Sequence, residues 1–546
     1  MNKVIIKSQL NTSCMFYLEK RDGFARIGRI EINGKTLETP CILDFSDEEM
    51  KNVLKSINFG YAPYIVKYLN ERIYEALKPK EDRLEILTGL SVLNPYELIR
   101  IFKELKFNKP IYAVASATPL TIPILVYLGV DVFDNILAIA KAYQGIYFFE
   151  DFEIGINDLK SFPCSCEACK QLKSNKDLSY EEKSELIAKH NTEVLKRKVE
   201  LCKILIERED LRNYIESVAK LNPELTVVLR LSKELEDERF SRFKKSKCYF
   251  NTIESFERFE VRYFLNRAVE CYKPKTKALL ILPCTAKKPY LTSKTHRAIR
   301  SKVKINVNEI IVSSPLVVPR EFELLYPAVN YDTPVTGHWT NEEIDFVAKW
   351  LRRFVEKGEF EKIVAHVEGG YRKVVERALQ DYEVVFTAEN GLTSDKSIDN
   401  LRRELECYTD RYDLYEEMFD HMFRYQFGID LNVKGEIRGR YPELELVRKD
   451  RLMRVDIEYG MLDVYRDVAK KLIDKKVYTI KIADFKPKSK IFASGVVDAS
   501  KGIQPNDIVV FYNDDVFGVG KAVMSSKEMI ELDRGLAVRV KRIWEF

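Results

Sequence analysis

Histidine is scarce in this chain, and a large excess of charge of either sign is missing. Only five histidines occur among 546 residues, so a histidine beside other reactive side chains is informative. Lys and Arg number 89 against 84 Asp and Glu, which leaves a net charge of +5. Any face that binds nucleic acid must therefore be local. The 22 Gly and 19 Pro follow no period, which excludes collagen-like and low-complexity chains.

The sequence also lacks a secretory signal and a convincing membrane span, which bears on where the protein is expected to be located. The start, MNKVIIKSQL, lacks the segments of a secretory signal, so we expect a cytoplasmic protein. The uncharged stretch from Ile111 to Val130 contains Pro119 and Pro123, and we expect a buried strand, a turn and a helix start there rather than a membrane span. The ten cysteines are then expected to be metal-binding, catalytic or buried rather than disulfide-bonded.

The length and a hydrophobic content of 46% predict three or four folded domains. Residues 27–32 and 111–114 read as strands, and Ser179 to Glu182 fits a capping box before a helix over 180–209. From Lys275 onward, buried strands alternate with helices, which predicts an α/β layer with a parallel sheet. The expected strands are 278–282, 309–313, 362–366 and 383–387, and the expected helices are 341–357 and 371–381.

A cysteine cluster gives the strongest metal signal. Cys164, Cys166 and Cys169 fall within six positions, and His190 follows in the next predicted helix. Three thiolates and one imidazole are a common structural Zn²⁺ set with no open position for chemistry. The alternative is a buried or solvent-facing cysteine cluster without metal.

The segments around this cluster resemble archaeal tRNA-guanine transglycosylase. The likeness lies in Gly129 to Asp134, Phe162 to Cys169 and Ala188 to Asn191. It implies a (β/α)₈ barrel with a zinc subdomain, and it puts Asp134 at the family's nucleophile. Two features depart from the family: its Asp-Ser-Gly segment is absent from residues 1–134, and only 163 residues precede the first zinc cysteine. A full barrel needs about 250. We therefore predict a degenerate barrel, in which Asp134 has a capping or loop role.

The densest reactive segment runs from Leu282 to Arg297. Cys284 follows a buried apolar strand, where sites form in open α/β sheets, and nearby cations favour a thiolate. The alternative is that Cys284 packs as a small apolar residue. The pattern Pro-Cys-x₃-Lys-Pro-Tyr-x₂-Ser-x₂-His resembles the signature of the archaeosine synthase family. Its candidate catalytic residues are Cys284, Lys288, Tyr290, Ser293 and His296.

This resemblance extends over essentially the whole chain, through Pro319 to Glu323 and Val335 to Trp339. It implies a transferase that converts the nitrile of 7-cyano-7-deazaguanine at tRNA position 15 to an amidine. The amine donor is glutamine, asparagine or ammonia, or lysine with a radical-SAM partner protein. Cys284 is the candidate nucleophile and His296 the candidate proton carrier. His338 and Glu368 are further candidates, and direct attack by the amine remains an alternative to a covalent route.

The last 70 residues or so resemble the PUA domain, a small pseudo-barrel that binds RNA. The glycines suit close approach to the RNA backbone and the basic residues suit phosphates, unless they merely solvate the strands. The candidate RNA-binding residues are Gly495, Gly502, Lys521, Arg539, Lys541 and Arg542.

We therefore predict an α/β multidomain protein with tRNA as partner and Zn²⁺ as a structural cofactor, and a homo-oligomer is compatible with the sequence. The expected domains are a degenerate, truncated TIM-barrel-like transglycosylase domain (1–270), an α/β core (271–395), an accessory α+β pre-PUA domain (396–472) and the PUA domain (473–546). The alternative functions are an active transglycosylase and a non-catalytic tRNA-binding subunit.

Overall fold

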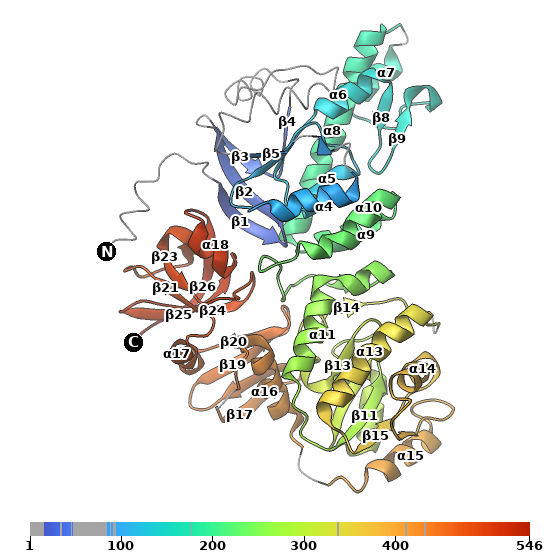
Figure 1. The fold of residues 1–546 in the computed structure, drawn as a ribbon, viewed down its shortest axis with the longest axis vertical. Helices are drawn as coiled ribbons and strands as arrows, with labels where there is room; N and C mark the ends of the chain where they lie inside the picture. Colours follow the sequence, from blue (N-terminus) through green and yellow to red (C-terminus); the bar gives the residue numbers. More distant parts are fainter. Residues whose placement is uncertain are drawn as a thin grey trace. The chain divides into compact units, whose positions relative to one another are not determined.

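The computed structural model describes residues 16–32, 35–44, 46, 84–87, 89–90, 94–175, 177–335, 338–409, 412–430 and 433–546. The chain forms two compact units (Figure 1). The first comprises Met1–Phe240, Lys481–Pro505 and Ala522–Val540, and the second Ser241–Ile480, Asn506–Lys521 and Lys541–Phe546. None of the helices within the described ranges is long and apolar enough to cross a membrane.

The N-terminal part contains two small sheets. The first is antiparallel, in the order β1 (Tyr17–Asp22), β2 (Ala25–Ile32), β3 (Lys35–Thr39). The second is parallel, in the order β4 (Cys41–Leu43), β7 (Val132–Asp134), β6 (Ile111–Ala113), β5 (Glu85–Leu87). Helices α4 (Pro95–Glu104), α5 (Thr121–Tyr127) and α6 (Ile136–Tyr143) follow β5, β6 and β7. The uncharged stretch is thus a buried strand, a turn and a helix, as predicted.

Helical structure dominates the rest of this segment. The hairpin β8 (Ile146–Phe148) and β9 (Glu153–Gly155) precedes α7 (Glu167–Ser174). Helix α8 (Tyr180–Glu207) starts at the predicted capping box, in which Ser179 and Glu182 hydrogen-bond each other's backbone N–H. Helices α9 (Leu211–Ala219) and α10 (Pro223–Leu231) complete the segment.

A five-stranded sheet forms the centre of the second unit. Its order is β13 (Val317–Pro319), β12 (Asn308–Val312), β11 (Ala278–Pro283), β15 (Lys362–Ala365), β16 (Val384–Phe386), and only β13 is antiparallel. The predicted parallel sheet is present, because strands such as Ala-Leu-Leu-Ile-Leu-Pro are apolar on both faces. A two-stranded parallel sheet of β10 (Cys248–Tyr249) and β14 (Tyr331–Asp332) lies outside it.

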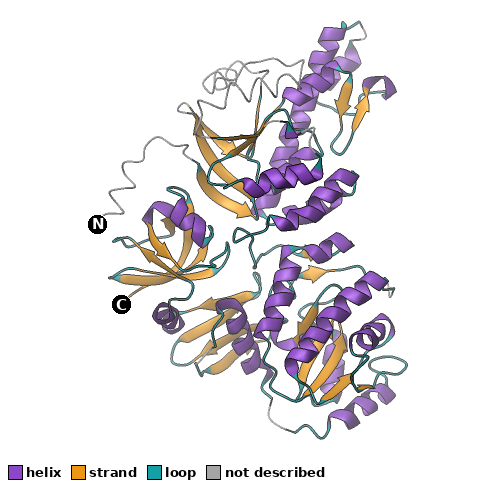
Figure 2. Ribbon diagram, in the orientation of Figure 1, coloured by secondary structure: helices purple, strands orange, loops and turns teal. Residues whose placement is uncertain are grey.

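Helices cover both faces of this sheet, as the alternation of its side chains shows. Leu279 and Ile281 of β11 belong to the core with α11 (Phe259–Cys271), α13 (Asn341–Gly358) and α14 (Gly369–Ala378). Leu280 and Leu282 pack with α12 (Lys294–Lys302) and α15 (Asp395–Leu405). Figure 2 shows these helices alternating with the strands. The sheet is therefore doubly wound, and the chain leaves β11 toward β12 and later returns to its other side as β15.

The remaining elements form two smaller layers. Helix α16 (Leu414–Phe427) precedes an antiparallel sheet of β17 (Glu436–Arg440), β18 (Glu443–Val447), β19 (Arg451–Asp456) and β20 (Met461–Val464), followed by α17 (Arg466–Lys475). The C-terminal stretch gives a curled six-stranded sheet in the order β22-β26-β25-β24-β21-β23. Its elements are β21 (Thr479–Ile482), β22 (Lys490–Phe492), β23 (Val496–Ala499), β24 (Ile508–Tyr512), β25 (Val516–Ala522), α18 (Ser526–Glu531) and β26 (Leu536–Glu545).

Candidate functional site

A cavity of about 330 Å³ opens at the carboxyl ends of the central strands. Its walls come from the segments after β11, β12, β14, β15 and β16, from α12 and from the start of α13, so it lies where the winding of the sheet reverses. This volume is at the small end of the range for ligand pockets. The polar and aromatic lining side chains are Cys284, Thr285, Thr295, Ser314, Thr333, His338, Trp339, Glu343, Glu368 and Tyr371.

Cys284 is held at the end of β11. Its backbone N–H donates to the Val312 carbonyl at 2.9 Å, which extends the ladder by one residue, and its side chain is half-buried. The Sγ atom lies 3.2 Å from the hydroxyl of Tyr371, in the first turn of α14. The ring of Trp339 packs edge-on against Tyr371, with centroids 5.1 Å apart. The sequence did not single out Tyr371, because it lies 87 positions along the chain from the cysteine, and it placed Trp339 only in the segment Val335 to Trp339 that carries the family resemblance.

Two carboxylates and one histidine also line the cavity. Glu368 precedes α14, and one of its oxygens accepts the Gly391 N–H at 2.8 Å. Glu343 caps α13 through Thr340 and accepts the Ser314 hydroxyl at 3.1 Å. His338 is exposed at the rim. The sequence candidates Glu368 and His338 thus belong to the same cavity as Cys284.

The other residues of the cysteine motif lie beneath the cavity. Ser293 caps α12, where its hydroxyl accepts the His296 N–H at 3.2 Å. Tyr290 is fully buried, and its hydroxyl hydrogen-bonds that of Tyr331. Neither side chain lines the cavity. Their contacts fix the shape of the loop that carries Cys284.

His296 is locked by two hydrogen bonds. Its Nδ1 lies 2.8 Å from an Arg320 guanidinium nitrogen, and its Nε2 lies 2.9 Å from the Pro283 carbonyl. Arginine only donates, so Nδ1 accepts and Nε2–H donates to Pro283. Burial, and then the charge of Arg320, lowers the pKa of His296 to about 3. These two contacts favour a neutral imidazole that holds the carbonyl next to Cys284 over the proton carrier expected from the sequence.

Lys288 does not line the cavity either, and its side chain packs on Tyr331. Its ammonium lies 4.0 Å from the ring centroid of Tyr331, a cation–π geometry. Burial lowers the pKa of Lys288, while the nearby Cys284 thiolate acts in the opposite direction. The lysine is thus placed to interact with negative charge at Cys284.

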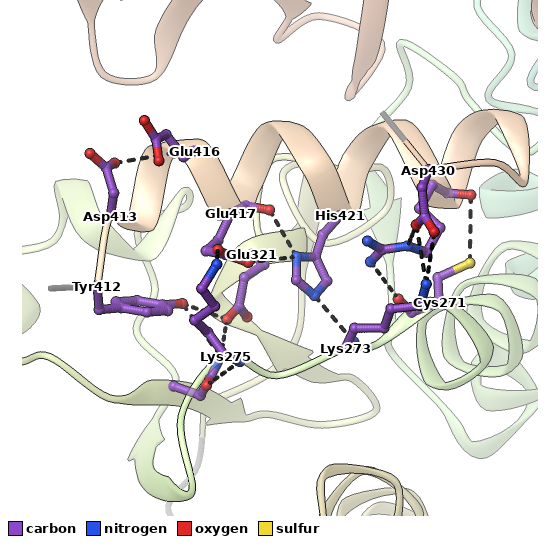
Figure 3. A network of polar contacts seen from close by, with 12 residues as sticks. Cys271, Lys273, Lys275, Glu321, Tyr412, Asp413, Glu416, Glu417, His421 and Asp430 are labelled. Carbon is purple, nitrogen blue, oxygen red and sulfur yellow. Dashed lines mark hydrogen bonds and ion pairs between the residues drawn. The ribbon is translucent and has the colours of Figure 1, made fainter. Parts of the chain in front are cut away.

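The segment from Pro319 to Glu323 buries its charges instead of exposing them. Arg320 is inaccessible and pairs with Glu309 and Glu323, each at 2.6 Å. Glu321 accepts the Tyr412 hydroxyl at 2.5 Å, as Figure 3 shows with Glu417 and His421 of α16 nearby. Burial raises the pKa of Glu321 to about 7. This part of the motif supports His296 and the packing of α16, away from the cavity.

The cysteine cluster of the first unit forms a candidate metal centre. The ligand atoms of Cys164, Cys166, Cys169 and His190 all lie within 4.8 Å of one another. His190 Nδ1 is 3.5 Å and 3.4 Å from the sulfurs of Cys166 and Cys169. Three thiolates and one imidazole converging in this way fit a tetrahedral metal site.

The surroundings of His190 also fit a metal ligand. Its Nε2 lies 2.9 Å from the Phe148 carbonyl, which leaves Nδ1 as the atom that faces the cysteines. Tyr147 stacks on the imidazole with centroids 3.9 Å apart, and its hydroxyl is 3.2 Å from Cys169 Sγ. These contacts orient the ring before any ion binds.

Asp134 is buried at the end of β7 and fully engaged. Its carboxylate accepts hydrogen bonds from the Tyr112 hydroxyl at 2.8 Å and from the backbone of Ala115 and Ile136 at 2.9 and 3.0 Å. Burial raises the pKa of Asp134 to about 6. These contacts support the structural role expected for it, and the described part of the parallel sheet has four strands rather than eight.

The C-terminal basic residues divide into two groups. Lys541 and Arg542 pair with Asp463 of β20 at 3.0 and 2.7 Å, and Lys541 also lies 3.9 Å from Asp456, so both cations are paired within the protein. The ammonium of Lys521 lies over the ring of Tyr459. All three thus contact other side chains of the protein, and their binding of phosphate stays a prediction.

Arg539 is exposed and lies opposite Lys490 on the neighbouring strand. Phe492 of that strand is 39% exposed. Lys490 is absent from the sequence candidates, because only strand pairing brings it opposite Arg539, while Phe492 pairs with Leu536 of the same strand. Gly502 has a positive φ of 80° with open space where a side chain would be, whereas a side chain at Gly495 would meet Phe485.

Four family models match the chain, in an order that fits the fold just described. They are queuine tRNA-ribosyltransferase over residues 86–224, a domain of unknown function over 261–405, a pre-PUA domain over 412–473 and the PUA domain over 481–544. The first covers the metal centre, and the second covers the cavity. The chain is thus of the transglycosylase-related class with a C-terminal PUA domain.

Curated relatives define the family more closely. Archaeosine synthase subunit alpha of Methanosarcina acetivorans is 33% identical over 506 residues, which cover 85% of this chain and 80% of the relative. Archaeosine synthase of Haloferax volcanii is 33% identical, over 79% and 76% of the two chains. The tRNA-guanine(15) transglycosylase of Methanothermobacter thermautotrophicus is 24% identical, over 80% and 67%. The chain belongs to the archaeosine synthase family.

Proposed function

We propose that this chain is a tRNA-modifying transferase that converts the nitrile of 7-cyano-7-deazaguanine at position 15 of tRNA to the amidine of archaeosine. The observation that carries the proposal is the position of Cys284 at the floor of a base-sized cavity, within contact of a phenol. The names of its relatives and the matching PUA domain support tRNA as the substrate.

The chemistry follows from the electrophilic carbon of a nitrile. The Cys284 sulfur adds to this carbon and loses its proton to give a thioimidate, and an amine then displaces the sulfur. Lys288 stabilises the negative charge that develops beside the thiolate. Glu368 binds the incoming amine, because one of its oxygens accepts the Gly391 N–H and the second has no hydrogen bond from the described residues. The nitrogen donor is glutamine, asparagine, ammonia or lysine.

The rest of the chain supplies binding and stability. A Zn²⁺ ion held by Cys164, Cys166, Cys169 and His190 would tie α7 to α8 as a closed structural site. Lys490 and Arg539 contact phosphates, and Phe492 offers a ring for stacking. Relatives named as an alpha subunit support a partner protein, and a radical-SAM enzyme would complete the reaction if lysine is the donor.

Mass spectrometry of nucleosides tests this function. Transfer RNA bearing the nitrile base is incubated with the protein and each amine in turn, and the amidine or its amine adduct is measured. Cys284→Ala should bind tRNA but form no product. Cys407→Ala is the matched control, since this exposed cysteine lies outside the cavity. Parent-rate turnover by Cys284→Ala would exclude the covalent route and leave direct attack by the amine.

A further inference from the structure

The contact between Cys284 and Tyr371 is short and enclosed. The two side chains come from different elements, the end of β11 and the first turn of α14, and both line the cavity. The 3.2 Å separation of sulfur and oxygen is within hydrogen-bonding range for sulfur. Among the defined positions of the cysteine motif, only Pro283 and Cys284 line the cavity, together with the hydroxyl-bearing Thr285 and Thr295 at its variable positions.

The fold holds the phenol in this place. Trp339 packs edge-on against the ring of Tyr371. The neighbouring Gly370 permits this approach, because a Cβ atom there would lie 2.2 Å from the Trp339 ring. Tyr371 also stands at the start of a ten-residue helix, where unpaired backbone N–H groups favour negative charge.

From this geometry we propose that Tyr371 is a catalytic residue that relays protons between Cys284 and the nitrile nitrogen. The inference rests on the proposed function and names a further group at the same site. Burial, and then the negative charge of a Cys284 thiolate, raises the pKa of Tyr371, so that the phenol keeps its proton at neutral pH. Such a protonated phenol can donate its proton to the nitrile nitrogen while it accepts a proton from the Cys284 thiol.

The relay balances in both halves of the reaction. In the first, a C–S bond forms as one C≡N π bond breaks, the nitrile nitrogen takes the phenol proton, and the phenol takes the thiol proton. The product is a neutral thioimidate. In the second, the amine forms a C–N bond, the C–S bond breaks, and the ammonium proton returns through Tyr371 to the sulfur. The amidine and the free thiol result, with no oxidant or reductant.

Tyr371→Phe tests the relay because it removes one oxygen and keeps the ring against Trp339. Tyr382→Phe is the matched control, since this half-buried tyrosine of the same unit lies outside the cavity. Formation of the covalent protein–tRNA adduct is followed without amine, in single turnover. General acid–base groups contribute about 10²–10⁴-fold, so Tyr371→Phe should slow adduct formation by that factor, with tRNA affinity and melting temperature unchanged. An adduct rate within twofold of the parent would overturn the proposal.

A second measurement separates this inference from the proposed function. Iodoacetamide labelling of Cys284 in the full chain, read by peptide mass spectrometry, requires no tRNA. Loss of the phenol should slow labelling at least threefold, and Tyr382→Phe should leave it unchanged. If the parent protein forms neither adduct nor amidine, the proposed function fails, and labelling then decides whether Tyr371 acts on Cys284. Equal labelling of parent and Tyr371→Phe would overturn that link.

Discussion

Replacement of His296 tests the view that a neutral imidazole supports the cysteine loop. His296→Ala removes the partner of two buried groups, the Pro283 carbonyl and one Arg320 nitrogen. Each unpaired buried group costs about 1–3 kcal/mol, so the loss is about 2–6 kcal/mol at pH 7. His296→Gln retains a donor for Pro283, and its cost should be about half of that. Loosening of this loop should also change the labelling rate of Cys284.

The pH dependence has a defined sign. Burial, and then Arg320, lowers the pKa of His296 from 6.5 to about 3, so the unfolded chain binds its proton first as the pH falls. The native state is therefore destabilised by this group below pH 6.5, and the loss between pH 7 and pH 5 is about 2 kcal/mol. Glutamine does not titrate, so the difference in unfolding free energy between the parent and His296→Gln should shrink by about this amount.

Denaturant unfolding followed by tryptophan fluorescence measures both effects. All three tryptophans, Trp339, Trp350 and Trp544, lie in the second unit with His296, so the signal reports that unit. A cost below about 1 kcal/mol for His296→Ala would refute the two buried hydrogen bonds. A difference between parent and His296→Gln that is the same at pH 5 and pH 7 would refute the neutral imidazole.

Three other predictions concern the first unit and the C-terminal strands. Cys166→Ser should lose about one equivalent of metal and lower the melting temperature. Cys202→Ser, which changes a buried cysteine outside the cluster, should keep its metal, and stoichiometric zinc in Cys166→Ser would contradict the site. The protein should not exchange labelled guanine into unmodified tRNA, because Asp134 is buried and accepts three hydrogen bonds; incorporation abolished by Asp134→Asn would establish a transglycosylase. Arg539→Ala should reduce the slope of log K against log salt for tRNA binding by about 0.7–0.9, while Arg542→Ala should mainly reduce stability. Equal slopes for the parent and Arg539→Ala would show that Arg539 makes no phosphate contact.

The local sequence pattern was sufficient to predict most of the helices and strands and the candidate metal ligands. The capping box at Ser179 and the apolar run of β11 are encoded by neighbouring residues, and the structure has both. Three cysteines within six positions reach one point from a single loop, so their convergence needs little more than a helix that returns His190. Motif spacing also drew attention to the segment that carries Cys284, and the structure places this cysteine in the cavity.

Tertiary structure alone decided which of the other polar residues face the cavity. Five candidates share one motif, yet burial directs His296 and Tyr290 inward, because the segment after β11 folds over the partners Arg320 and Tyr331. Tyr371 reaches Cys284 only because parallel strands end at one edge of the sheet and place the start of α14 beside β11. Likewise, Asp463 neutralises Arg542 across strands far apart in the chain. A sequence lists the side chains that can react, but burial and strand order determine which of them meet a ligand.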